Sequence, residues 1–323
     1  GNDEGAPPGI FGYDNLPTYT SRDYGANGNN SYWVPNGEAR LEGFPPIMGG
    51  ERIELDFRAR QVMIKAEQRK SGSDGLGAPG FNIDNLRELM YDNRNIAADM
   101  MTDDVVAICR AVTDWSPYSD NPEAAVGICD ILDNWDRAYN LDSVGSHIFF
   151  EFFAKVYQFD NLWAVPFNSD DPLYTPRDLN VADAALVETL LYALGDVVDE
   201  LLADNIPLNI AWGEIQYSER NGERIGIHGG SGVFMFNAIY ADRVAEAGYT
   251  EDFAGSSFIM ATTWDDTDCP DAFGVMTYSQ STDPASPHFA DLTKLYSQKG
   301  WVDLPFCEAD IAAQEISRES IKE

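Results

Sequence analysis

The stretch FGVMTYSQSTDPASPHFADLTKLYSQKGWVDLPF (Phe273–Phe306) begins as a short apolar segment and continues into a loop that contains two prolines. The apolar segment, taken as Ala272–Gln280, is the last of four that are short and bounded by Gly, Asp or Pro, which is typical of β-strands. The other three are Leu208–Gln216, Gly232–Ile239 and Ser256–Trp264. Their links are too short or irregular for crossover helices, so we expect antiparallel pairing. The sequence therefore predicts an antiparallel strand region over 206–323, ending in a charged helix from Glu308 to Glu323.

The chain before this region is predicted to be helical over 81–205. Thr102, followed by two aspartates, predicts a capped helix start, and Asn121-Pro122 predicts another. Apolar residues at helical spacing predict two further helices, near 148–156 and over 181–203. The first 80 residues are rich in Gly, Pro, Asn and Tyr, which indicates irregular chain with an amphipathic helix from about Leu55. The fold class that follows is α+β.

Composition narrows the possible partners. The 323 residues are 44% hydrophobic and 23% charged, which is enough apolar material for a sizeable core. Lys and Arg number 21 against 54 Asp and Glu, a formal charge of −33. Such a field repels phosphate backbones and anionic lipid surfaces. No apolar stretch is long enough to span a bilayer. We therefore expect neither nucleic acid nor a membrane as a partner, and attribute the charge to a solvated acidic shell.

Motifs for cofactors and metals are missing from the sequence. It contains no GxGxxG, GxxxxGK[ST], HExxH or GxSxG, and its four cysteines form no CxxC pair. The run Asp265–Asp268 lacks the Gly and terminal Glu of a calcium loop, which favours a solvated turn. The three histidines lie in different predicted elements, and nothing in their spacing favours a metal. We expect no cofactor and no metal.

One histidine, His288, has Asp283 and Asp291 nearby in the sequence, which could indicate an acid–base cluster. Prolines at 284 and 287 make the segment a rigid loop, so we interpret these side chains as fixing that loop. Composition alone leaves open whether the four cysteines form two disulfides or are buried thiols.

The segment ANGNNSYW (Ala26–Trp33) contains three asparagines within four residues. A side-chain amide is a neutral donor suited to a developing oxyanion. The alternative is a turn in which these amides cap their own backbone, and from chemistry alone this is the commoner case. Arg58 and Arg60 open the predicted helix near Leu55. A guanidinium can orient a catalytic amide, although a surface ion pair is the usual role in an acidic chain.

Six segments together resemble the penicillin amidase family, most closely its acyl-homoserine-lactone and aculeacin-type acylase branch. They occur in the family's order and cover nearly the whole chain. They are NNSYW (Asn29–Trp33), LEGFPPI (Leu41–Ile47), FRAR (Phe57–Arg60), NWDRAYNLDSVGSHIF (Asn134–Phe149), HGGSGVF (His228–Phe234) and the stretch Phe273–Phe306.

The resemblance implies an N-terminal-nucleophile hydrolase with an αββα sandwich, here carrying a helical insertion. In this family a Ser at the start of the large subunit attacks an amide carbonyl, its own α-amino group acts as the base, and an acyl-enzyme follows. By matching motifs, Asn29 is the oxyanion donor, with Asn30 as the fallback. Either Arg60 or Arg58 is the arginine that braces it, since the spacing leaves the choice open.

The chain departs from the family pattern at its start, which is Gly1 and not Ser. We therefore expect it to be the C-terminal part of the large subunit, with the nucleophile supplied by a segment outside it. Its expected partners are the rest of the large subunit, the small subunit and a small acyl-amide substrate. Penicillin or cephalosporin acylase activity is the enzyme alternative. A non-catalytic periplasmic binding or structural module is the other.

The same resemblance places the protein in the periplasm or outside the cell, where disulfides persist. We predict a Cys109–Cys129 disulfide, because both residues lie on the core faces of neighbouring predicted helices. A Cys269–Cys307 disulfide is predicted as the second pair.

Overall fold

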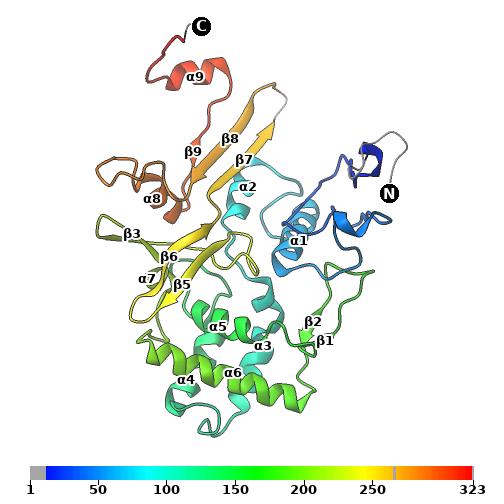
Figure 1. The fold of residues 1–323 in the computed structure, drawn as a ribbon, viewed down its shortest axis with the longest axis vertical. Helices are drawn as coiled ribbons and strands as arrows, with labels where there is room; N and C mark the ends of the chain where they lie inside the picture. The colour runs from blue at the N-terminus through cyan, green and yellow to red at the C-terminus, as the bar shows by residue number, and fades with distance from the viewer. Residues whose placement is uncertain (1–11, 265–266, 322–323) are drawn as a thin grey trace.

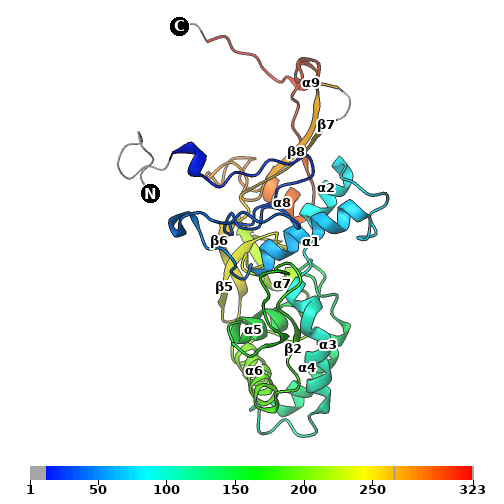
Figure 2. The same ribbon diagram turned by 90° about the vertical axis from the view of Figure 1, so that its right-hand side faces the viewer.

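The computed structural model describes residues 12–264 and 267–321. The molecule is elongated, with a group of helices at one end and the C-terminal strands and helix at the other (Figures 1 and 2). The helices of the described residues are α1 (Phe57–Ser71), α2 (Ile83–Met90), α3 (Ile96–Ala111), α4 (Pro122–Asn134), α5 (Ser146–Val156), α6 (Ala184–Ala203), α7 (Trp212–Ile215), α8 (Asp291–Ser297) and α9 (Glu308–Gln314), with short 3-10 turns at Tyr13–Asn15 and Pro46–Met48. None of them combines the length and apolar character of a membrane span.

Helices α3 to α6 form one end of the molecule around a large apolar core. The predicted start at Pro122 is confirmed, and so is the helix over 181–203, which begins one residue after Asp183. The Asp183 carboxylate accepts hydrogen bonds from the backbone N–H groups of residues 185 and 186, which satisfies two free donors of the first turn. The Cys109–Cys129 disulfide is confirmed and joins α3 to α4 within this core.

The start predicted at Thr102 is wrong. Helix α3 begins six residues earlier, at Ile96, and Thr102 is buried within it. Asn95 provides the cap: its Oδ1 accepts from the backbone N–H groups of Ala97 (2.9 Å) and Ala98 (3.3 Å). A cap about two turns upstream therefore takes the place of the Thr-Asp-Asp signal.

The strands of the described residues form four small sheets, and every strand pair in them is antiparallel, as predicted. The pairs are β1 (Trp163–Val165) with β2 (Arg177–Leu179), β3 (Tyr217–Arg220) with β4 (Glu223–Gly226), and β5 (Ile239–Val244) with β6 (Gly248–Gly255). The fourth sheet has the order β7 (Phe258–Trp264), β8 (Pro270–Met276), β9 (Val302–Asp303). The α+β class is confirmed.

Two of the four predicted strands are wrong. The segment Leu208–Gln216 is irregular and then forms the short helix α7. The segment Gly232–Ile239 begins as a turn, in which the backbone N–H groups of residues 234 and 235 both donate to the carbonyl of Ser231, and only its last residue enters β5. Short apolar runs are buried in either conformation, so their composition does not separate strand from buried turn or helix. The strands predicted from Ser256–Trp264 and Ala272–Gln280 are confirmed as β7 and β8.

Within the described residues, the β7–β8–β9 sheet is covered on one face only. Ile259 and Val275 point to the covered face and join a buried cluster with residues of α2 and α8. The opposite face is apolar and exposed. The register places five exposed side chains on it: Phe258 (54% exposed), Met260 (53%), Trp264 (68%), Met276 (37%) and Val302 (37%). We call this set the open sheet face.

The predicted C-terminal helix holds only for its first seven residues, since α9 ends at Gln314 and the described residues beyond it are not helical. No residue of α9 is buried. A short helix without apolar packing has little to extend it in water. The predicted Cys269–Cys307 disulfide is confirmed, and it attaches the start of α9 to the chain just before β8.

Candidate active site

The asparagine-rich turn lies beside the first turn of α1. Two of its amides serve the turn itself: Asn30 Oδ1 accepts from the backbone N–H of Gly28 (2.9 Å), and Asn27 Oδ1 accepts from that of Asn29 (2.8 Å). Asn30 also donates from Nδ2 to the carbonyl of Ser31. Asn27 and Asn30 therefore cap the backbone of their own turn, as in the alternative interpretation, whereas the side chain of Asn29 does not.

Asn29 is exposed and occupies the left-handed region with φ 65°. Asparagine adopts this conformation more readily than most residues. Its side chain bonds away from the turn: Oδ1 accepts a hydrogen bond from Nη1 of Arg58 at 3.0 Å. Its Nδ2 makes no hydrogen bond to any described residue. The acceptor end of this carboxamide is therefore fixed, and both N–H groups of the donor end are available.

Gly28 allows the turn to sit against α1. A Cβ at this position would lie 2.9 Å from Cα of Ala59, closer than a Cβ comes to another carbon atom. Ala59 is the third residue of α1 and is fully buried, so it cannot move away from the added atom. The position therefore requires glycine because the two backbones approach closely.

Arg58 joins three distant segments. Besides Asn29, it binds the carbonyl of Gly232 through Nε at 2.7 Å. Gly232 belongs to the segment HGGSGVF, 174 residues further along the chain. A guanidinium with two of its donors used in this way has little freedom to rotate. Arg58 therefore fixes the orientation of the Asn29 carboxamide.

Arg60 has a different environment. It is 2% exposed and donates from Nε to the carbonyl of Leu173 and from Nη1 to that of Pro176, each at 3.0 Å. Burial lowers the pKa of its guanidinium to about 10. A cavity of about 350 Å³ lies beside Arg60, and Asn29 is not among the residues that line it. The structure therefore brings Arg58 to Asn29 and uses Arg60 to hold the loop that contains residues 173–176.

The contribution of Gly232 was missed in the sequence. HGGSGVF is a segment of the family resemblance, and the strand predicted over Gly232–Ile239 does not indicate that the Gly232 carbonyl binds Arg58. The signal available was the group of three glycines within five residues, which is typical of a turn in which backbone groups face a partner.

The histidines do not form a shared site. His147 is buried in α5 and contacts the carbonyl of Pro207 through Nε2 at 3.1 Å. His228 is buried near α8. His288 is exposed and pairs with Asp291 at 2.7 Å. Asp283 accepts from the backbone N–H groups of residues 285 and 286, so it fixes the loop, as interpreted from the prolines.

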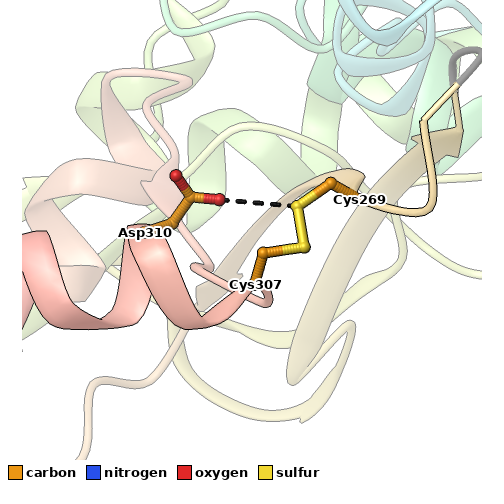
Figure 3. A group of neighbouring side chains, drawn as sticks. All are labelled: Cys269, Cys307 and Asp310. Atoms are coloured by element: carbon orange, nitrogen blue, oxygen red, sulfur yellow. Dashed lines mark hydrogen bonds between the residues drawn. A yellow bond between two sulfur atoms is a disulfide. The ribbon is translucent and has the colours of Figure 1, made fainter.

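One group of possible metal ligands occurs among the described residues: Cys269, Cys307 and Asp310 (Figure 3). Both sulfurs belong to the disulfide, so neither is a thiolate that could bind a metal. Asp310 Oδ2 lies 3.6 Å from Cys269 Sγ. Of the aspartate run at 265–268, Asp265 and Asp266 lie outside the described residues.

The sequence signature of the family described as Penicillin amidase matches residues 1–313. The chain belongs to the penicillin amidase family. Among curated members, the chain is 37% identical to aculeacin-A acylase from Actinoplanes utahensis over 311 residues, 96% of this chain. It is 29% identical to the acyl-homoserine lactone acylase PvdQ from Pseudomonas syringae pv. syringae over 312 residues, again 96% of the chain. PvdQ from Pseudomonas putida is 28% identical over 319 residues, or 98%.

In each of these comparisons the match covers 38% of the penicillin amidase family relative. The chain therefore spans less than two fifths of the length of the relatives that it resembles.

Proposed function

We propose that this chain is part of an amide hydrolase that removes an acyl chain from an N-acyl homoserine lactone, a lipopeptide or a related amide. The observation that carries the proposal is the Arg58–Asn29 contact, with Asn29 Oδ1 bound and its Nδ2 available. The names of the relatives, aculeacin-A acylase and acyl-homoserine lactone acylase, support an amide with an acyl chain over a β-lactam substrate.

The chemistry proposed for Asn29 is donation to an oxyanion. A serine from outside this chain attacks the amide carbonyl, and its proton passes to its own α-amino group, whose ordinary pKa is near 7.7–8.0. The carbonyl oxygen becomes negatively charged, and an N–H of Asn29 Nδ2 donates to it. The oxyanion then collapses to the acyl-enzyme as the C–N bond breaks and the amine leaves with a proton. Water hydrolyses the ester through a second oxyanion at the same place.

Arg58 strengthens this donor in two ways. Its hydrogen bond draws electron density from Oδ1, which polarises the N–H groups at the other end of the carboxamide. Its positive charge also lies at the opposite end of the Asn29 carboxamide from the proposed oxyanion, whose energy it lowers. Asn29 itself has no ionisable group, so this donor does not titrate near neutral pH.

The open sheet face supports the proposal that the full-length protein has an αββα sandwich. A sheet covered by helices on one side and apolar on the other is one half of an αββα sandwich, whose second sheet packs on the apolar side. We propose that this second sheet, the nucleophile and the small subunit come from the parts of the protein that lie outside this chain. The two disulfides support a periplasmic or extracellular location, where such bonds persist.

The test is the turnover of Asn29→Ala in the full-length protein that contains this chain. Loss of one oxyanion donor lowers kcat by about 10²–10³. We expect this loss with a long-chain acyl homoserine lactone as substrate, with KM and thermal unfolding little changed. Asn134→Ala is the control, because Asn134 is exposed at the end of α4 and its side chain bonds, among the described residues, only to the carbonyl of Asp130. Turnover of Asn29→Ala at the wild-type rate would remove Asn29 from the mechanism. Faster hydrolysis of phenylacetyl amides than of the lactone would favour a penicillin acylase.

A further inference from the structure

A buried group of polar side chains surrounds His228, at the start of the segment that contains Gly232. Nδ1 of His228 lies 3.1 Å from Nδ2 of Asn93 and 3.0 Å from Nδ2 of Asn237, and Nε2 lies 2.8 Å from the carbonyl oxygen of Tyr296. Asn93, His228, Asn237 and Tyr296 are all at least 98% buried. They come from the α2–α3 connection, the segment before β5, and α8.

The donors and acceptors of this group assign one state to His228. A carbonyl only accepts, so Nε2 carries the hydrogen, and Nδ1 of the neutral ring accepts from the two amides. Asn237 Nδ2 also donates to Oδ1 of Asn93 at 2.9 Å, and Asn237 Oδ1 accepts from the Tyr296 hydroxyl at 3.0 Å. The Tyr296 hydroxyl also lies 3.1 Å from the carbonyl oxygen of His228, so its one hydrogen is shared between two acceptors, and the members of the network hold each other in place.

The backbone that follows His228 is fixed at each step. Gly229 donates to the carbonyl of Tyr139, and its own carbonyl accepts from Trp212 Nε1 and Gln216 Nε2, all at 2.9 Å. Gly229 has φ 93°, and a Cβ there would lie 2.6 Å from the carbonyl oxygen of Asn237. Gly230 then bonds to residues 237 and 239 through its N–H and carbonyl.

Two residues later the same segment presents the Gly232 carbonyl to Arg58. A rigid path of hydrogen-bonded groups thus connects His228 to Gly232, Gly232 to Arg58, and Arg58 to Asn29. We infer that His228 is a positioning residue, which fixes the 228–232 segment so that Gly232 holds Arg58 and, through it, the Asn29 carboxamide. The inference rests on the proposed function for its catalytic consequence, while the structural link to Arg58 can be measured without any activity.

The structural link is tested by NMR on the 323-residue chain labelled with ¹⁵N-arginine. The Nε–H signal of Arg58 is assigned from its loss in Arg58→Lys, and its exchange with solvent is measured. We expect exchange at least about tenfold faster in His228→Ala, since local opening sets the exchange rate. Tyr296→Phe removes the hydroxyl that binds Asn237 and keeps the ring, so a smaller acceleration is expected if His228→Ala does not fold. His147→Ala is the matched control, because His147 is equally buried but lies in α5. Unchanged Arg58 exchange in each network variant that folds would overturn the inference.

The catalytic consequence is tested by a double-mutant cycle in the full-length protein. His228→Ala is expected to lower kcat by up to about 10²-fold with KM nearly unchanged, because a misplaced donor acts mainly on the transition state. In the Asn29→Ala background the same substitution should change kcat by only about twofold. Equal losses in both backgrounds would mean that His228 acts through stability and not through Asn29. Wild-type turnover of Asn29→Ala would overturn the proposed function alone, and the exchange measurement would still decide the role of His228.

Discussion

Nη1 of Arg58 donates to Oδ1 of Asn29 at 3.0 Å, while Nε of the same guanidinium donates to the carbonyl of Gly232 at 2.7 Å. Arg60, two residues further along α1, makes its bonds to carbonyls of another loop. The two arginines of FRAR therefore have separate roles, one at the candidate active site and one in the framework.

Arg58→Ala should lower kcat of the full-length protein by about 10–10²-fold, because the Asn29 carboxamide then loses the group that orients it. Arg60→Ala should act on stability, since it leaves the buried carbonyls of residues 173 and 176 without a donor, at about 1–3 kcal/mol each. Urea unfolding and steady-state kinetics on both variants provide the measurement. A larger kcat loss in a fully folded Arg60→Ala than in Arg58→Ala would reverse the assignment.

Gly28→Ala should move the asparagine turn away from α1. The added methyl would lie 2.9 Å from Cα of Ala59, which is backbone that cannot rotate aside. We expect about 1–3 kcal/mol of destabilisation from overpacking and a kcat reduced by up to about 10²-fold. Gly25→Ala is the control in the same segment, because its nearest neighbour would be at 3.8 Å, an ordinary contact. Equal behaviour of the two variants would contradict the close-approach argument.

The open sheet face should be covered in the full-length protein. Trp264 is 68% exposed in this chain, and burial against apolar groups would shift its fluorescence to shorter wavelength. The isolated chain should self-associate through this face, and Met260→Lys should reduce that association, since an inward charge opposes edge and face pairing. Analytical ultracentrifugation of the chain with and without the substitution measures this. A wild-type chain that stays monomeric at high concentration would argue against an unpartnered face.

The two disulfides should differ in what they stabilise. Cys109 and Cys129 are buried and 20 residues apart, so replacing both with alanine should lower the free energy of unfolding by about 3 kcal/mol. Cys269 and Cys307 attach α9, none of whose residues is buried, so their replacement should release α9 and leave the main unfolding transition in place. Urea unfolding followed by tryptophan fluorescence, with limited proteolysis of the C-terminal segment, distinguishes the two effects. Loss of the main transition on removing Cys269 and Cys307 would show that the C-terminal bridge also stabilises the core.

Stability should fall as the pH is lowered from about 6.5 towards 4, in part because of His147. Burial lowers the pKa of His147 to about 4 from its ordinary value of 6.5. Between these values the unfolded chain binds a proton that the folded chain does not, so the stabilisation is complete above pH 6.5 and is lost on acidification. The expected contribution is about 1.4 kcal/mol per pH unit. Carboxylates titrate in the same range, so the test is the difference in slope between wild type and His147→Gln in urea unfolding from pH 7 to pH 5. Identical slopes would show that His147 is not the source.

The sequence allowed the helices to be predicted where their apolar faces were long and their caps were unambiguous. Proline at residue 122 and the apolar stripes of α5 and α6 are examples. It did not allow Leu208–Gln216 to be assigned, because a short apolar run is buried equally well as a strand or as an irregular segment with one helical turn. Thr102 shows a related problem: a good capping residue within a helix is not used when Asn95 caps the helix further upstream.

At the candidate site, too, some features could be predicted from the sequence and others could not. The asparagine turn and the arginine pair were both apparent from the residues and the family resemblance. Arg58 and Arg60 are two positions apart, which separates their side chains by about 200° around a helix. Which of them faces Asn29 depends on where Gly232 lies, and that position is set by tertiary packing far along the chain. No local pattern contains this information.

The contacts of Arg58 also have a consequence for when the molecule becomes competent during folding. Its partners lie 29 residues before it and 174 residues after it, so the two hydrogen bonds of Arg58 cannot both form until distant parts of the chain have packed together. Closing such long loops is slow compared with forming local helices. Helices α3 to α6 can therefore be fully folded while the Asn29 carboxamide still rotates freely. A partly folded molecule would then have its helical core but no oriented hydrogen-bond donor at Asn29. The Asn29 carboxamide is therefore oriented late in folding, so catalytic activity requires the completed fold.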